Sequence, residues 1–289
     1  MNWRPREPEA VLPDGLRRLV ITAMAAFAGI PVLFMLLMSV TPDDQVAAGK
    51  LWPTHFAFSN YLTMWSTVSL ADGLFNSVVA ALVAAVVATL VAVGAAYCLT
   101  RFVFSGQRPF LVSLVMMQSL PQSLLILPLV VVFSSLGNAL GVAIIGSRGG
   151  LIVTYLTFAL PLATWVMVTH LRAIPASLEE AGLVDGLTRF GTLRLIILPL
   201  SWPGMVVALV FSFLLGWNDV LYASILTGPD TRTAAVQLQQ LGQSIEGGAI
   251  PLYGQLMGAS VICAIPVVVL YLAFQRQLTG GLTSGGVKG

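Results

Sequence analysis

Six long apolar stretches constrain the fold of this chain more than any other feature of its sequence. A helix needs about 20 apolar residues to cross the hydrocarbon core of a bilayer. Hydrophobic residues make up 57% of the 289 residues, above the roughly 45–50% of a soluble domain. The sequence therefore predicts an all-α, polytopic membrane protein with six transmembrane helices. Their expected ranges are Leu19–Val40, Phe75–Leu99, Phe110–Leu136, Leu151–His170, Trp202–Leu226 and Leu256–Phe274.

The domain organisation follows from these stretches. Residues 1–18 are polar and interrupted by prolines, so we expect a cytoplasmic N-terminal tail with little structure. Residues 19–276 form the predicted transmembrane domain, and residues 277–289 form a cytoplasmic C-terminal tail. The first apolar stretch is interpreted as a retained helix, because no small-residue cleavage site follows it.

The placement of lysine and arginine predicts the orientation in the membrane. Cytoplasmic loops carry an excess of both residues. One side of the six helices would carry Arg4, Arg6, Arg17, Arg18, Arg101, Arg108, Arg172, Arg189, Arg194, Arg276 and Lys288, and the other side Lys50, Arg148 and Arg232. Both termini are therefore expected in the cytoplasm of a bacterial-type cytoplasmic (inner) membrane. No basic cluster is interleaved with aromatic residues, so we expect no nucleic-acid partner.

One cytoplasmic loop, residues 175–204, is unusually polar for this chain. It contains "SLEEAGLVDGLTRFGTLRLIILPLSWPG", which starts at Ser177. Ser177 followed by Glu180 matches a capping box and predicts a helix start. Gly186 is suited to end that helix after two turns at most. A second helical stretch is expected over Thr188–Leu198, where Pro199 limits its continuity with the next span.

The residues of this short helix leave two roles open. In one, the helix is a well-capped loop at the membrane surface with no partner. In the other it docks on a partner, because Leu178 and Ala181 offer contact surface and the acidic side chains can meet cations. An isolated two-turn helix is marginal in water, so it must pack on something in either case.

The loop resembles the EAA loop that marks the membrane subunits of binding-protein-dependent ABC importers. That motif reads E-A-A, three residues, G, nine residues, I-x-L-P. The matching positions are Glu180, Ala181, Gly182, Gly186, Ile196, Leu198 and Pro199. Only Gly182 departs from the pattern, which usually has alanine there. Further segments, such as "FSNYLTMW" and "FSFLLGWNDVLYASIL", are similar in the same order to carbohydrate permeases of the maltose-transporter type.

The resemblance implies a permease subunit that imports a sugar or a related polyol or oligosaccharide. Its partners would be a sister permease in a heterodimer, two ATPase subunits and an extracytoplasmic solute-binding protein. ATP and Mg would be bound by the ATPase subunits, and this chain would hold no cofactor, metal or catalytic residue. The residues implied in ATPase coupling are Ser177, Glu179, Glu180, Ala181, Gly182, Asp185, Gly186 and Pro199. Glu180 is expected to pair with a basic group of the ATPase.

Two other segments are candidate sites. Trp217, Asn218 and Asp219 either line the substrate path or satisfy backbone groups where the helix loosens after Gly216. The external loop Gly228–Gly254 resembles the segment that, in this family, enters the cleft of the binding protein. An ordinary surface loop is the alternative. Its expected contact residues are Glu246, Gly247, Gly248 and Tyr253.

An ATP-independent secondary transporter or channel is the competing functional class. Such proteins commonly use ionisable residues near the middle of the membrane. Asp219 is the one Asp, Glu, Lys or Arg inside a predicted span and has no obvious partner, which argues against ion coupling. A membrane enzyme is disfavoured because the chain lacks H-E-x-x-H, G-x-S-x-G and P-loop motifs.

Overall fold

The structure of the protein is a computed structural model that describes residues 13–243, 245–246 and 250–283. Within this part, six helical segments are long and apolar enough to cross a membrane. They are Asp14–Ser39, Leu70–Arg101, Gln122–Leu140, Arg148–Ala173, Arg189–Trp217 and Tyr253–Leu278. The predicted all-α polytopic fold is therefore confirmed. The chain divides into two compact units, one with the described residues up to Met64 and Gly242–Ile262, the other with Trp65–Leu241 and the described residues from Cys263.

The first unit contains the N-terminal helices and a small hairpin. Its elements are α1 (Asp14–Ser39), α2 (Asp43–Ala47), the start of α3 (Asn60–Thr67), strands β1 (Ile245–Glu246) and β2 (Ile250–Pro251), and the first part of α13 (Tyr253–Thr283). The two strands pair antiparallel. Asn60 Nδ2 donates to the carbonyls of Ser39 and Thr41, and the Gly254 N–H donates to Asp43 Oδ1 at 2.6 Å. These bonds join the segments after α1 and after the hairpin.

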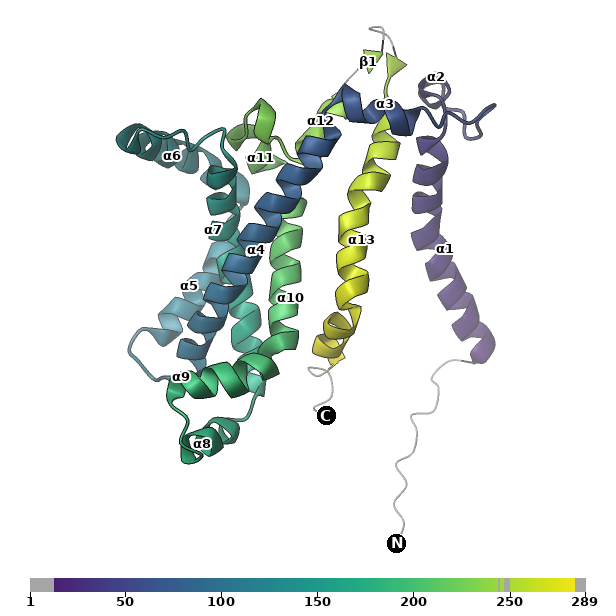
Figure 1. The fold of residues 1–289 in the computed structure, drawn as a ribbon. Helices are drawn as coiled ribbons and strands as arrows, with labels where there is room; N and C mark the ends of the chain where they lie inside the picture. The colour runs from purple at the N-terminus through teal and green to yellow at the C-terminus, as the bar shows by residue number, and fades with distance from the viewer. Residues whose placement is uncertain (1–12, 244, 247–249, 284–289) are drawn as a thin grey trace. The chain divides into compact units, whose positions relative to one another are not determined.

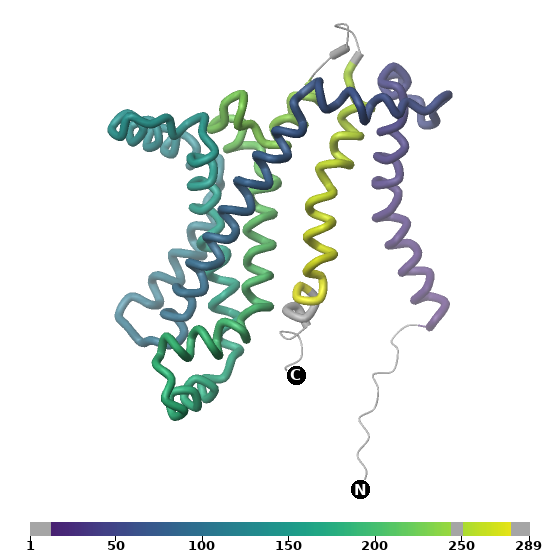
Figure 2. Tube along the Cα trace, viewed as in Figure 1, coloured from purple at the N-terminus to yellow at the C-terminus, as the bar shows by residue number. Residues whose placement is uncertain are grey.

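The second unit contains the remaining elements. They are α4 (Leu70–Arg101), α5 (Gln107–Ser119), the 3₁₀ turn η1 (Gln122–Leu125), α6 (Ile126–Leu140), α7 (Arg148–Ala173), α8 (Ser177–Val184), α9 (Arg189–Thr192), the π-helical turn η2 (Leu193–Ile197), α10 (Leu198–Trp217), α11 (Leu221–Leu226), η3 (Pro229–Thr231) and α12 (Ala234–Gln243). Helices α4, α7 and α10 pack side by side (Figures 1 and 2). Helices α8 and α9 lie at one end of this group and α11 at the other.

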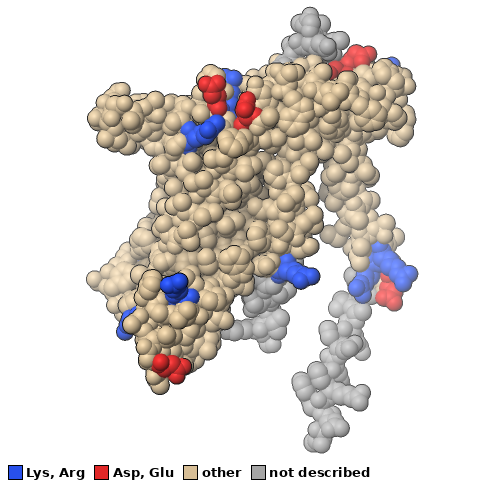
Figure 3. All heavy atoms as spheres, in the orientation of Figure 1, with Lys and Arg blue, Asp and Glu red and all other residues tan. Residues whose placement is uncertain are grey.

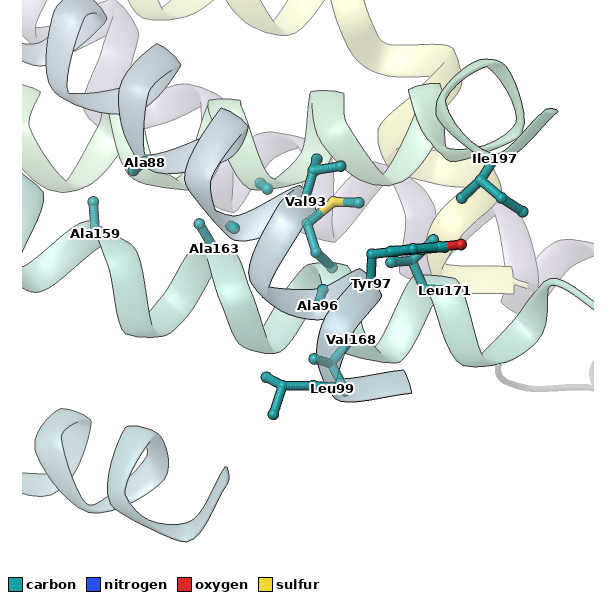
Figure 4. Packing of buried hydrophobic residues seen from close by; sticks show 13 residues of the cluster. Ala88, Val93, Ala96, Tyr97, Leu99, Ala159, Ala163, Val168, Leu171 and Ile197 are labelled. Atoms are coloured by element: carbon teal, nitrogen blue, oxygen red, sulfur yellow. The ribbon is translucent and has the colours of Figure 1, made fainter. Parts of the chain in front are cut away.

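Alanine residues let α4 approach both of its neighbours. Without a hydrophobic force between helices in lipid, small residues at the contacts allow close van der Waals packing. Ala84 and Ala88 are fully buried on the side that meets α7, whereas Ala81 and Ala85 pack with Phe213 of α10. Figure 4 shows a buried cluster in which side chains of α4, α7 and η2 meet. The small-residue composition of this span is typical of a helix that packs inside a bundle.

The third predicted span, Phe110–Leu136, is wrong as a single helix. Helix α5 ends at Ser119, and the described candidate span is Gln122–Leu140. The residue before a proline is driven out of the helical region, and Leu120 before Pro121 has an extended ψ of 131°. Beyond this break α6 runs across the end of α7 instead of alongside α4 (Figure 1).

The fifth predicted span, Trp202–Leu226, is also interrupted. Helix α10 ends at Trp217, and α11 begins at Leu221. The predicted tail boundaries differ as well, because α1 begins at Asp14 and α13 continues to Thr283. The cytoplasmic location of both tails stays a prediction.

Charged side chains gather at the two ends of the second unit. Figure 3 shows acidic and basic groups at the end formed by α8 and α9 and at the end near α11, with uncharged surface between them. This arrangement is expected of helices whose middle parts face lipid, because a charged side chain there is costly.

Candidate functional site: the α8 loop

Helix α8 begins at Ser177, where the sequence predicted a helix start, but it is not capped as predicted. The N–H groups of Glu179 and Glu180 both donate to the carbonyl of Ala176, and Ala176 already has helical dihedral angles without a side-chain cap. The predicted capping box of Ser177 and Glu180 is therefore wrong.

The end of α8 agrees with the sequence. Gly186 has a φ of +87°, the left-handed conformation that glycine adopts without strain. The Gly186 N–H donates to the carbonyl of Leu183, and the Leu187 N–H donates to that of Gly182. This pair of bonds is the Schellman motif, which satisfies carbonyls left free at a helix end. The helix is thus held to two turns.

A continuous helical path leads from the loop into α10. The Thr188 hydroxyl caps α9 by accepting from the Gly191 N–H at 3.1 Å. The π turn η2 follows, in which the Leu198 N–H donates to the carbonyl of Leu193. A π turn widens the backbone by one residue, which gives Pro199 room beside the preceding turn. The predicted bend before the span is visible between α9 and α10 (Figure 1).

Gly182 faces the interior of its own chain. It is buried, and a Cβ placed there would lie 2.6 Å from Ile196 Cδ1 and 3.4 Å from Thr192 Oγ1. The structure places the missing methyl group against η2, so the departure from the usual alanine affects how α8 packs on its own chain.

The opposite face of α8 is open. Ser177, Glu180, Ala181 and Asp185 are exposed, and the side chain of Val184 is 87% exposed. Leu183 on α8 and Phe190 on α9 extend this apolar surface. We call the exposed side chains of Glu180, Ala181, Leu183, Val184 and Phe190 the α8 face. Two apolar turns with one free carboxylate form a surface suited to docking.

Glu179 is fastened inside the chain instead of facing outward. Its carboxylate forms an ion pair with Arg101 at the end of α4, and both side chains are only 12% exposed. The Tyr97 hydroxyl donates to the same carboxylate at 3.3 Å. Arg101 Nη2 also donates to the carbonyls of Leu171 and Ile174, at 3.3 and 2.9 Å. Arg101 therefore connects α8 to the ends of α4 and α7.

The other end of α4 carries a second junction. Asn76 is 1% exposed, and its Nδ2 donates to the carbonyls of Asp230 and Arg232 at 3.1 and 2.9 Å. Its Oδ1 accepts from Arg148 Nε at 2.6 Å, and the Arg148 guanidinium lies over the Phe75 ring. Helix α4 is thus bonded to the α8 loop at one end and to the segment around η3 at the other.

The Gly216–Asp219 turn satisfies backbone groups of its own chain. Asp219 accepts from the N–H groups of Tyr222 and Ala223, at 3.2 and 2.9 Å, and from the Tyr155 hydroxyl at 3.2 Å. Burial raises the pKa of the Asp219 carboxyl, an effect that the two backbone N–H groups oppose. Asn218 is exposed, and its Nδ2 donates to the carbonyl of Leu214.

Trp217 lies in the core with its ring covered. The side chain is 8% exposed and stacks on Phe213 with ring centroids 5.5 Å apart. Gly216 beside it has no room for a side chain, because a Cβ there would lie 2.7 Å from the Tyr155 ring. These contacts fit the structural alternative for the turn. A role of Trp217, Asn218 and Asp219 in the substrate path stays a prediction.

The tip of the external loop is described in part. The backbone of Glu246 pairs with Ile250 in the hairpin, and Tyr253 is exposed at the start of α13. Gly247 and Gly248 lie outside the described residues. Contact of these residues with a binding protein stays a prediction.

Arg101, Tyr97 and Asn76 were not singled out in the sequence. Arg101 contributes there to the charge asymmetry alone, and Asn76 lies near the start of an apolar stretch. A polar residue at each end of a span only weakly indicates a buried junction, because residues at span ends commonly face water.

A comparison with known protein families identifies the family of this chain. Residues 87–280 match the family described as "Binding-protein-dependent transport system inner membrane component". The chain belongs to this family. It is therefore a multi-pass membrane component of an ABC transport system, as the EAA-type loop indicated.

Curated permeases are similar over most of their length. The trehalose transport system permease protein SugB of Mycobacterium tuberculosis is 33% identical over 93% of this chain and 95% of the relative. The diacetylchitobiose uptake system permease protein NgcG of Streptomyces coelicolor is 30% identical, over 89% and 83%. The maltose/maltodextrin transport system permease protein MalG of Salmonella typhimurium is 32% identical, over 94% and 96%.

A solved structure shares the fold. A chain from the crystal structure of a bacterial ABC transporter involved in the import of the acidic polysaccharide alginate superposes with a TM-score of 0.74 at 19% identity, covering 90% of this chain and 94% of that one. A second structure of the alginate ABC transporter, in complex with a pentasaccharide-bound periplasmic protein, gives a TM-score of 0.67 at 16% identity.

Proposed function

We propose that this chain is one permease subunit of an ABC importer that moves a disaccharide or short oligosaccharide into the cytoplasm. The family membership supports the class of transporter, and the sugars in the names of the similar permeases support the substrate class. In this proposal a sister permease completes the pathway, and two ATPase subunits bind and hydrolyse ATP with Mg. A solute-binding protein delivers the sugar from outside, and both termini of this chain are cytoplasmic.

The observation that carries the proposal is that the two sides of α8 differ. The outer side, the α8 face, exposes Glu180 and Val184, while the inner side is fixed by Gly182 and by the Glu179–Arg101 ion pair. A helix held this way transmits force between a partner that docks on it and the membrane helices behind it. A loop that only covers the membrane surface needs no such attachment to α4 and α7.

The other candidate residues have supporting roles in the proposal. Pro199 positions the start of α10 behind the docking helix, and Gly186 ends α8 before the chain turns back. Glu246, Gly247, Gly248 and Tyr253 are proposed to contact the docked binding protein. The C-terminal tail is proposed to make a weak contact with the ATPase pair.

Reversal of charge at Glu180 tests the docking role. Glu180 makes no capping bond in α8, so Glu180→Lys should cost only the favourable effect of an acid near a helix start, about 0.3–1 kcal/mol. We expect the variant complex to insert normally but to lose sugar-stimulated ATP hydrolysis and uptake in proteoliposomes. Asp14→Lys, at the exposed start of α1, is the matched control. Full coupling in Glu180→Lys would refute the docking role.

A further inference from the structure

A small, partly open pocket with a mixed polar and apolar lining lies where the third span is broken. Its volume is about 170 Å³, and it is lined by residues of α5, η1, α7 and α10. The polar side chains that line it are Gln118, Gln122 and Thr157, and Phe158 and Leu215 supply apolar walls. No charged residue lines the pocket. It is below the roughly 300–1,000 Å³ of sites for drug-sized ligands, so it holds one small ring at most.

The position of the pocket along α5 gives its expected depth in the membrane. Gln118 is near the end of the 13-residue helix α5, which rises about 1.5 Å per residue. It therefore stands roughly 17 Å along that helix, and we infer that it lies within a hydrocarbon core about 30 Å thick. Among the described residues, neither the Gln118 nor the Gln122 side-chain amide makes a hydrogen bond to the protein. An amide left without partners at this depth is costly.

The backbone adds an acceptor to the same place. Pro161 lines the pocket and lies inside α7. It has no N–H to donate to the carbonyl of Thr157, one turn earlier, so this carbonyl lacks its usual helical partner. The Thr157 hydroxyl donates to the carbonyl of Val153 and keeps its acceptor capacity. The pocket thus combines two free amides with two acceptors of Thr157.

Tyr222, which follows the Gly216–Asp219 turn, packs against the wall of the pocket. The Tyr222 hydroxyl donates to the Gln122 carbonyl at 2.6 Å, and the Tyr222 ring packs on Phe158 with centroids 4.9 Å apart. Asp219 in turn accepts from the Tyr222 N–H. Asp219 is thereby connected to the pocket through Tyr222, without lining it.

We propose that this pocket binds one sugar ring of the substrate during transport. Sugar hydroxyls both donate and accept, as amide side chains do, and the Phe158 ring offers a flat apolar surface to the C–H face of a pyranose. The absence of charge favours a neutral ligand over an ion. Broken transmembrane helices commonly form such sites in transporters. This inference rests on the proposed sugar-import function.

Replacement of the amides tests the pocket in the complete transporter. Gln118→Leu and Gln122→Leu are compared with Asn138→Leu on α6, an exposed amide outside the pocket. Proteoliposomes receive the binding protein loaded with trehalose, maltose or diacetylchitobiose, whichever the wild type transports. We expect ATP hydrolysis to remain stimulated while the sugar accumulated per ATP falls about 3- to 10-fold for each pocket variant, as for the loss of a hydrogen bond. The control should keep the wild-type ratio.

A second measurement stays valid if the leucine variants fail to assemble. Thr157→Cys, in a background with Cys98→Ala and Cys263→Ala, is labelled with a small permeant maleimide. Sugar trapped in the complex by ATP and vanadate should protect the cysteine, whereas the same complex without sugar should be labelled.

The outcomes separate the two proposals. Labelling of Thr157→Cys at the same rate with and without sugar would overturn the pocket assignment. A cysteine that is already blocked by the sister subunit or by lipid when no sugar is present would overturn it too. Unchanged sugar per ATP in both leucine variants would overturn it as well. If the wild-type complex moves no disaccharide or short oligosaccharide, these three included, the proposed function is wrong, and this inference falls with it.

Discussion

Two adjacent carboxylates in α8 have different environments and different expected roles. Glu180 is exposed, whereas Glu179 is paired with Arg101 and accepts from Tyr97. Neighbouring positions on a helix point about 100° apart, so one residue can face a partner while the next faces the interior. Glu179 therefore belongs to the attachment of α8 and not to its docking surface.

Removal of Arg101 should do more damage than neutralisation of Glu179. Breaking a buried ion pair costs about 3–5 kcal/mol, and Arg101 in addition supports the carbonyls of Leu171 and Ile174. We expect Arg101→Met to lower the melting temperature of the complex more than Glu179→Gln. Both should reduce the sugar moved per ATP. The exchanged pair Arg101→Glu with Glu179→Arg separates the two contributions of Arg101. It should restore the ion pair but not the hydrogen bonds to the carbonyls of Leu171 and Ile174.

Asp219 variants should differ by the number of acceptors that they keep. Asp219→Asn retains one oxygen for the three donors that Asp219 now serves, and Asp219→Ala retains none. We expect a loss of stability for both variants, with the larger loss for alanine, at about 0.5–1.5 kcal/mol per bond. The melting temperatures of the purified variant complexes show which substitution costs more stability. Normal stability with lost uptake in Asp219→Ala would favour a direct role in the substrate path.

At the scale of elements, α8 is positioned by what covers its inner face. Gly182 lets the helix approach η2, where Ile196 Cδ1 occupies the space of a methyl group. That atom is the flexible end of a side chain, so it can move if a methyl group is added. The π turn that precedes Pro199 brings Ile196 to this position, which connects α8 directly to the start of α10.

Gly182→Ala should be nearly neutral in stability. Alanine favours a helix over glycine by about 0.8–1.0 kcal/mol, and the displacement of Ile196 offsets this gain. Shortening the neighbour with Ile196→Val should therefore make the double variant more stable than the two single changes predict. A double-mutant cycle on melting temperature measures the coupling. Strict additivity would show that the close approach has no energetic consequence.

At the scale of the whole molecule, the expected orientation depends on the distribution of charge among loops. Val103, in the loop after α4, is exposed and is predicted to be cytoplasmic, whereas Lys50 is exposed and predicted to be external. With Cys98 and Cys263 replaced by alanine, single cysteines report the side directly. We expect a membrane-impermeant maleimide to label Lys50→Cys but not Val103→Cys in intact spheroplasts. The reverse pattern would place both termini outside.

The sequence by itself determined the features that depend on local composition and spacing. The number of apolar spans follows from the length that a bilayer requires, and Gly186 marked the end of α8 because its conformation is local. The EAA-type spacing indicated the family before any coordinates. The interruption at Leu120 was not recognised, because the apolar stretch continues through it. Near Trp217 a loosening after Gly216 was one of two interpretations, but the predicted span still ran on to Leu226.

The tertiary structure alone decided which side chains meet. Arg101 and Glu179 are 78 positions apart in the chain, and no local periodicity reports which helix will cover a given face. The same holds for the inward direction of Gly182 and for the pocket at Gln118 and Thr157, whose walls come from separate helices. In lipid, small residues permit many close packings. The polar contacts at the helix ends and the breaks at the prolines distinguish the packing that is adopted.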